Sequence, residues 1–168
     1  MLYISRARGT KAPPLIFHGG TVTPITTVDS RISKSPGLRW LGYWFDRRNS
    51  GRRHVNERAA KALYVASHIR SLGGVKYGAP AASLWKAAVT CVLSSATYAA
   101  EAWYNPAKRQ RGLLRQLQRP ITKAARAVLP AWRTAPTATV LRDAGLPSAK
   151  VAAQQTRLRF AFRLKTAD

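Results

Sequence analysis

The sequence predicts an α+β fold that is mostly helical, with short antiparallel strands at the N-terminus followed by a helical bundle. Residues 1–50 are rich in β-branched and aromatic residues punctuated by Pro and Gly, a composition typical of short strands. The remaining residues are rich in Ala, Leu and Arg, and their apolar positions recur at helical spacing. Strands and helices do not alternate, which argues against a doubly wound parallel sheet.

Three N-terminal segments are typical of strands. Residues 14–18 form a short apolar run that ends at a Gly-Gly turn. Residues 21–28 are largely β-branched, and Pro24 places that strand at a sheet edge. The segment Leu38–Asp46, Leu-Arg-Trp-Leu-Gly-Tyr-Trp-Phe-Asp, is the most strand-like of the chain.

We expect Leu38–Asp46 to form a single strand with two distinct faces. Its side chains then alternate, with Trp40, Gly42, Trp44 and Asp46 on one face and Leu41, Tyr43 and Phe45 on the other. One face is predicted to be core. The other either also packs in the core or offers a ring and backbone to a nucleic-acid strand.

Two long helices are predicted first in the C-terminal part. One runs from about Asn56, its expected cap, to Leu72, and Gly73-Gly74 ends it. The next runs from about Pro80 to Trp103, with many small residues that favour close helix packing.

A third helix is predicted over about 108–129 and contains Pro120. Proline costs roughly 3 kcal/mol in a helix interior, so we expect a kink or two helices, with Pro120 in the first turn of the second. Short helices are expected at about 137–144 and 148–164, separated by Gly145-Leu146-Pro147.

The charge points to an anionic partner. The 168 residues carry 29 Lys and Arg, mostly Arg, against 6 Asp and Glu, which gives a net charge of +23. So basic a chain repels itself unless an anion neutralises it. Nucleic acid fits Arg best, because Arg pairs bidentately with phosphate and stacks on bases; an acidic membrane surface is the other candidate.

The scarcity of acids excludes several chemistries. No two of the six carboxylates lie within ten residues of each other, so no paired-carboxylate site with local spacing is predicted. Cys91 is the single cysteine and the histidines are scattered, so we expect no metal site and no catalytic residues. The sequence shows no signal peptide and no transmembrane segment, which favours an intracellular protein of the nucleus or cytoplasm.

The third helix carries a row of cations on one face. At 100° per residue the row falls on one side, opposite an apolar side that includes Leu117 and Ile121. No Asp or Glu is available to pair with the row. We therefore expect this face to bind nucleic-acid phosphates through Lys108, Arg111, Arg115, Arg119, Lys123 and Arg126.

A second basic cluster surrounds the turn after the aromatic segment. It comprises Arg47, Arg48, Arg52 and Arg53, with His54. Its cations are also predicted to contact nucleic acid, beside the neighbouring aromatic rings.

Four segments resemble non-LTR (LINE-type) retrotransposon reverse transcriptases, especially fungal ones. Residues 38–46 are similar to the Leu-Gly-containing primer grip at the end of the palm. Residues 98–104 match a Tyr-Gly-x-Glu-x-Trp pattern, with Ala99 in place of the usual Gly. Residues 129–137 and 141–148 look like linkers beyond the thumb, and the likeness spans nearly the whole chain.

The resemblance implies a domain layout. Residues 1–50 would be palm-end strands, 51–130 thumb-like helices and 131–168 connection-like helices. The primer-grip-like residues would be Trp40, Leu41, Gly42 and Tyr43. RNA and DNA, as a template–primer duplex, would be the partners, together with the missing upstream part of the polymerase.

The catalytic part of that family is missing. Its polymerase site holds Mg²⁺ with aspartates that include a Tyr-x-Asp-Asp box, and this sequence contains no Asp-Asp pair. We therefore expect no cofactor and no polymerisation by this chain, a truncated or decayed copy or a gene-model fragment. The alternative is a stand-alone basic RNA- or DNA-binding module.

Overall fold

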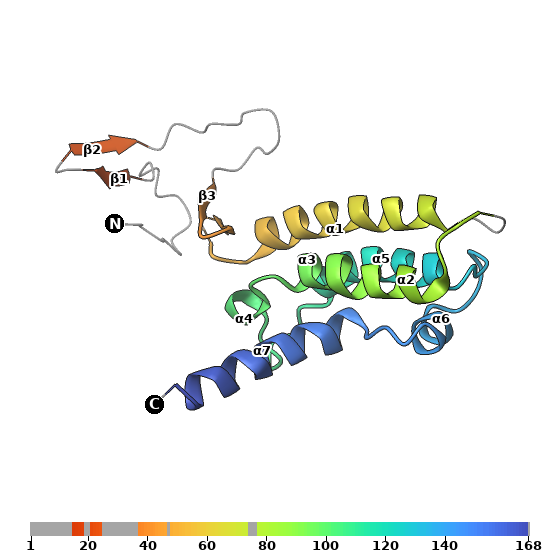
Figure 1. The fold of residues 1–168 in the computed structure, drawn as a ribbon. Coiled ribbons are helices and arrows are strands. Elements are labelled where there is room, and N and C mark those ends of the chain that lie inside the picture. The colour runs from red at the N-terminus through yellow and green to blue at the C-terminus, as the bar shows by residue number, and fades with distance from the viewer. Residues whose placement is uncertain (1–14, 19–20, 25–36, 47, 74–76, 168) are drawn as a thin grey trace. The chain divides into compact units, whose positions relative to one another are not determined.

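The computed structural model describes residues 15–18, 21–24, 37–46, 48–73 and 77–167 (Figure 1). The chain divides into two compact units, residues 1–54 and 55–168. Described strands lie in the first unit and the second is helical, so the prediction of a mostly helical α+β fold with short antiparallel strands is confirmed. The segments 51–130 and 131–168 both contribute helices to the second unit.

The first strand pair matches two of the predicted segments. β1 (Leu15–His18) pairs antiparallel with β2 (Thr21–Pro24), with Ile16 opposite Thr23. The expected continuation of the second strand, residues 25–28, lies outside the described residues.

The second strand pair corrects the prediction of one strand over 38–46. β3 (Gly37–Trp40) and β4 (Tyr43–Asp46) form an antiparallel hairpin. Leu41 and Gly42 both have positive φ, 47° and 78°, as a two-residue type I′ turn requires. Gly42 adopts this conformation readily, whereas Leu41 does so at a steric cost.

The hairpin also changes which side chains share a face. Tyr43 stands opposite Trp40, and Trp44 stands opposite Arg39. Directly opposed residues of an antiparallel pair lie on one face. Trp40 and Trp44, which a single strand would place together, therefore lie on opposite faces.

Helix α1 (Arg52–Leu72) begins four residues before the predicted cap, Asn56. The Asp46 carboxylate accepts hydrogen bonds from the Ser50 N–H (2.8 Å) and hydroxyl (2.7 Å). The Ser50 hydroxyl oxygen in turn accepts the N–H of Arg52 (3.3 Å). Ser50 thus satisfies a free N–H of the first turn. This explains why α1 begins at Arg52 and not near Asn56.

The predicted helix 80–103 is broken. The structure has α2 (Ala81–Ala87), a π-helical segment η1 (Ala88–Leu93), α3 (Ser94–Thr97) and α4 (Ala100–Trp103). Ala99, between α3 and α4, has φ 54° and ψ 30°, a left-handed conformation that ends the helix.

A four-residue spacing of buried side chains accompanies the π-segment. Cys91, Tyr98 and Ala102, which a regular α-helix would place on the same side as Leu84, are exposed. The wider i→i+5 turns of η1 keep residues four apart on one side. The buried residues are Leu84, Ala88, Val92, Ala96 and Ala100.

Helix α5 (Arg111–Val128) is one helix with Pro120 inside it, so of the two expected alternatives, a kink or two helices, the division into two helices is wrong. The ring of Pro120 is fully buried, as are the side chains of Leu117 and Ile121. Burial of this face outweighs the hydrogen bond that proline removes.

The last two helices lie close to their predicted bounds, as α6 (Thr137–Asp143) and α7 (Ala149–Lys165). Gly145, at φ 62°, follows α6. Its N–H reaches the Arg142 carbonyl and the Leu146 N–H reaches the Leu141 carbonyl, each at 3.0 Å, which forms a Schellman motif. Ser148 caps α7 by accepting the Val151 N–H (3.4 Å).

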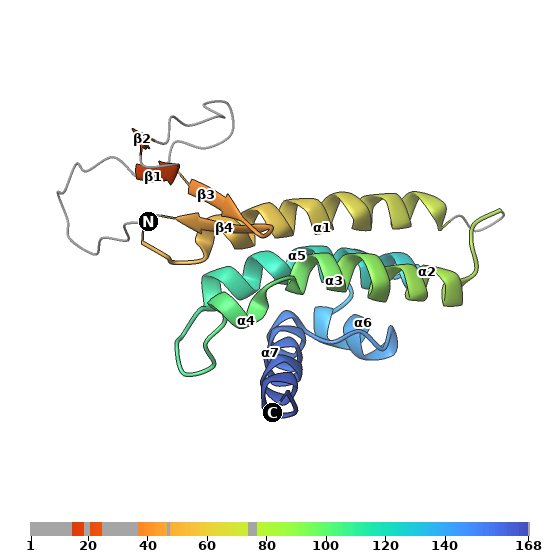
Figure 2. The ribbon, with the colours of Figure 1, turned by 60° about the vertical axis from the view of Figure 1, so that its left-hand side comes forward.

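Within the second unit, α1, the α2–η1–α3 segment and α5 run side by side, and α7 crosses beneath them (Figures 1 and 2). A Cβ on Gly73, at the end of α1, would stand 3.3 Å from Leu84 of α2 and 3.4 Å from the Ala127 carbonyl oxygen of α5. Alanines make up much of the buried face of each helix, which allows this close approach.

Candidate nucleic-acid interface

The predicted cation row follows the face of α5 opposite its buried side. Arg111, Arg115 and Arg119 are exposed, and Lys123 and Arg126 are half-buried. Arg109 and Lys108 precede the helix and are exposed as well, with the Lys108 N–H bonded to the Asn105 carbonyl in a turn (3.1 Å). Spacing alone was sufficient to predict this face.

A groove of about 450 Å³ runs along the cation row. Its walls come from α1, α5 and the segment 131–137 that connects α5 to α6. Among the described residues that line the groove, six are cationic and none is acidic. These cations are Arg70, Arg115, Arg119, Lys123, Arg126 and Arg133.

Two of the α5 cations hold the groove walls in place. The Lys123 ammonium donates to the Ser67 hydroxyl of α1 (2.6 Å). The Arg126 Nη2 donates to the Ala135 carbonyl beyond α5 (3.0 Å). Lys123 thereby holds a side chain of α1, and Arg126 holds the backbone beyond α5. Both cations still line the groove.

Sequence reasoning missed two of the groove cations, Arg70 and Arg133. Arg70 lies in the last turn of α1, and Arg133 follows the end of α5. No local pattern joins residues so far apart in the sequence. Only the packing of α1 against α5 brings them together.

The basic cluster around the turn after the aromatic segment differs in exposure from one residue to the next. Arg47 lies outside the described residues, whereas Arg48 and Arg52 are exposed. Arg53 is half-buried, and its guanidinium lies over the Trp44 ring, 4.4 Å from the centroid. Arg53 thus makes a cation–π contact within its own unit, which leaves Arg48 and Arg52 as the open cations.

His54 is part of the core of the first unit. It is fully buried, stacks on Tyr43 with centroids 4.3 Å apart, and its Nδ1 accepts the Trp44 N–H (3.4 Å). The basic cluster therefore does not include the His54 ring.

The primer-grip-like residues form the turn of the second hairpin and its flanks. Trp40 and Leu41 are 63% and 81% exposed, whereas Tyr43 is 7% exposed. Burial raises the pKa of the Tyr43 hydroxyl, and the Asp46 carboxylate raises it further. Trp40, rather than Tyr43, is therefore the exposed ring at this hairpin turn; Gly42 is half-buried.

Two of the described carboxylates make local contacts. Asp46 accepts hydrogen bonds in the turn before α1, and Asp143 pairs with the neighbouring Arg142 (3.0 Å). Within the described ranges, no three His, Cys, Asp or Glu side chains gather where a metal ion could bind. The helices in the same ranges are too short or too polar for any of them to cross a membrane.

No protein-family model, no curated protein and no solved structure matches this chain.

Proposed function

We propose that this chain binds the sugar-phosphate backbone of nucleic acid through the groove beside α5. The observation that carries the proposal is the set of six cations that line one groove with no carboxylate among its described lining residues. Like charges held this close repel each other unless anions lie between them. A phosphate backbone supplies anions in a row, as the groove requires.

The cations suit phosphate in type as well as in charge. Arg115 and Arg119 are one helical turn apart and exposed, so successive guanidinium groups face the same side. Arg binds phosphate oxygens with two parallel hydrogen bonds. Such contacts fix the register and orientation of the nucleic acid and carry no sequence information.

We also propose that the chain is a non-catalytic piece of a reverse transcriptase of non-LTR retrotransposon origin. The resemblance of four segments in the family order supports this origin. The backbone at Ala99 adds support, because its φ of 54° lies in the region that favours glycine, and the family pattern has Gly at this position. The hairpin would then face the primer end, and the groove would contact backbone phosphates of the template–primer.

A salt titration of the full chain tests the binding proposal. We expect affinity for duplex or single-stranded nucleic acid to fall steeply as salt rises, because bound phosphates release counterions. Vesicles of anionic lipid, titrated in parallel, should bind more weakly at equal charge. Salt-independent binding to nucleic acid, or stronger binding to the vesicles, would refute the proposal.

A primer-extension assay with Mg²⁺ or Mn²⁺ tests the second part. We expect no templated incorporation, since the sequence carries no Asp-Asp pair to hold two metal ions. Incorporation by the purified chain would show that its carboxylates form a polymerase site after all.

A further inference from the structure

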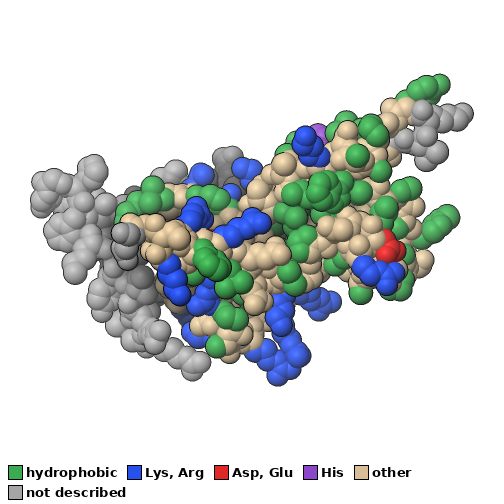
Figure 3. Space-filling view, turned by 60° about the horizontal axis from the view of Figure 1, so that its bottom comes forward, with side chains coloured by type: hydrophobic (Ala, Val, Ile, Leu, Met, Phe, Trp, Pro, Cys, Tyr) green, Lys and Arg blue, Asp and Glu red, His purple; other side chains and the backbone are tan. Residues whose placement is uncertain are grey.

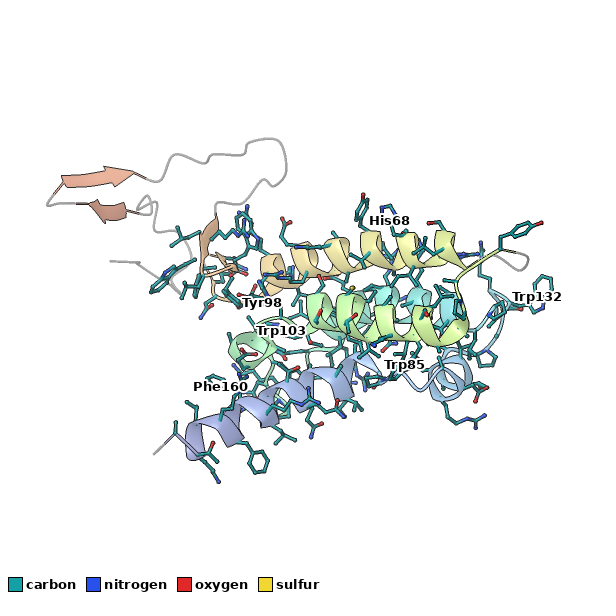
Figure 4. All side chains as sticks on the ribbon, viewed as in Figure 1. His68, Trp85, Tyr98, Trp103, Trp132 and Phe160 are labelled. Atoms are coloured by element: carbon teal, nitrogen blue, oxygen red, sulfur yellow. The ribbon has the colours of Figure 1, made fainter. Side chains whose placement is uncertain are left out.

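One large aromatic side chain lies on the segment that forms one wall of the groove. Trp132 follows the end of α5 and is 85% exposed. Its two sequence neighbours, Ala131 and Arg133, both line the groove. In Figure 4 the Trp132 ring projects outward from the connection between α5 and α6.

The connection that carries Trp132 is held in place by hydrogen bonds. The Ala135 N–H donates to the Trp132 carbonyl (3.1 Å), which closes a turn. The Ala135 carbonyl oxygen also accepts a hydrogen bond from Arg126 Nη2 (3.0 Å), which links this turn to α5. The ring is therefore displayed on a fixed backbone, and little ordering is needed when a ligand binds.

An indole exposed to water gives up the free energy that its burial would provide. Trp132 is nevertheless exposed, and it is next in sequence to Arg133, one of the groove cations. Phosphates in the groove would bring nucleobases close to the ring. The bases of a duplex are already stacked and paired, whereas those of a single strand have free faces. Stacking on an aromatic ring suits any unpaired base, whatever its sequence.

We propose that Trp132 stacks on an unpaired base of a single strand whose phosphates lie in the groove. The inference rests on the proposed backbone binding and adds a preference for single-stranded nucleic acid. Arg133, next to the ring, would hold a phosphate beside the stacked base. The proposed ligand is thus a single-stranded segment, either alone or beside a duplex.

The experiment compares Trp132→Ala with two further variants of the full chain. Trp132→Phe keeps a ring, and Phe162→Ala removes another exposed aromatic ring, 68% exposed, from α7. The probes are a single-stranded oligonucleotide, a stable abasic strand of the same length, and a long duplex. Thermal unfolding of each variant controls for folding.

We expect Trp132→Ala to bind the single-stranded oligonucleotide about tenfold more weakly than wild type, the usual range for one stacked base. Its affinity for the abasic strand and the duplex should stay within about twofold, because phosphate contacts are unchanged. Trp132→Phe should recover part of the loss, and Phe162→Ala should bind as wild type does.

Two results would overturn the inference and leave backbone binding intact: no loss on the single strand, or an equal loss on the abasic strand. A greater loss with Phe162→Ala than with Trp132→Ala would also overturn it, since α7 would then supply the stacking ring. If wild type binds none of the probes in a salt-dependent way, the proposed function itself fails.

Discussion

Helices α5 and α7 have nearly the same length and charge but arrange that charge differently. They span 18 and 17 residues, and each carries five cations and no acid. On α5 the cations recur every three or four residues, opposite a buried face. On α7 they stand at Lys150, Arg157, Arg159, Arg163 and Lys165, which distributes them around the helix.

The apolar residues follow the same contrast. On α5 most of them are buried, as Leu117 and Ile121 show, whereas the second half of α7 exposes Leu158 and Phe162. On the face shown in Figure 3, Lys and Arg side chains lie dispersed between hydrophobic ones. A high net charge therefore does not by itself define a candidate binding site; on α5 the cations are also segregated opposite a buried face.

The largest expected difference concerns stability. Leu117→Ala should destabilise the chain by about 3 kcal/mol, because it leaves a cavity in the α5 core. Leu158→Ala, the matched change on α7, should shift the free energy of unfolding by under about 0.5 kcal/mol. Urea unfolding of both variants checks this, and equal losses would mean that α7 is packed as tightly as α5.

The next difference concerns affinity for nucleic acid. Arg119→Gln removes a groove cation and should weaken binding roughly five- to tenfold at low salt. Arg159→Gln removes an equal charge from α7 and should change affinity by less than about twofold. Fluorescence anisotropy with one labelled duplex measures both. If the two variants lose affinity equally, net charge and not the groove determines binding.

A smaller effect is expected where the chain turns from α6 into α7. Gly145→Ala should destabilise the chain by about 1 kcal/mol, because an L-residue is strained at φ 62°. A Cβ there would stand 3.7 Å from the Trp85 Nε1, an ordinary contact, so the cost is conformational. Thermal unfolding checks the loss, and an unchanged midpoint would argue against the Schellman motif.

The smallest expected effect has the opposite sign. Ala99→Gly should stabilise the chain by roughly 0.5–1 kcal/mol, because glycine adopts φ 54° without strain. Ala96→Gly, in the neighbouring helix α3, serves as the control and should destabilise. A loss of stability in Ala99→Gly would mean that the left-handed conformation at residue 99 is not the native one.

Periodicity in the sequence predicted much of this structure. The two sides of α5 follow from apolar spacing, the end of α1 at Leu72 from Gly73-Gly74, and the bounds of α6 and α7 from the break at Gly145-Leu146-Pro147. These features are local, so a single sequence carries them.

The errors fall where tertiary contacts or unusual backbone override local preference. The hairpin turn uses Leu41-Gly42 without the Asn-Gly signal, so residues 38–46 read as one strand. Pro120 stays within α5 because that face is buried. The cations of the groove were predicted only in part, because Arg70 and Arg133 reach it through helix packing and not through local spacing.

The salt dependence of binding by two charge-matched double variants tests the central claim most directly. Arg115→Gln with Arg119→Gln should reduce the slope of log affinity against log salt by about 1.8 on a duplex, as expected for two lost phosphate contacts. Arg159→Gln with Arg163→Gln, on α7, should leave the wild-type slope nearly unchanged. Equal reductions in the two variants, or none in the α5 variant, would contradict a phosphate-binding groove beside α5.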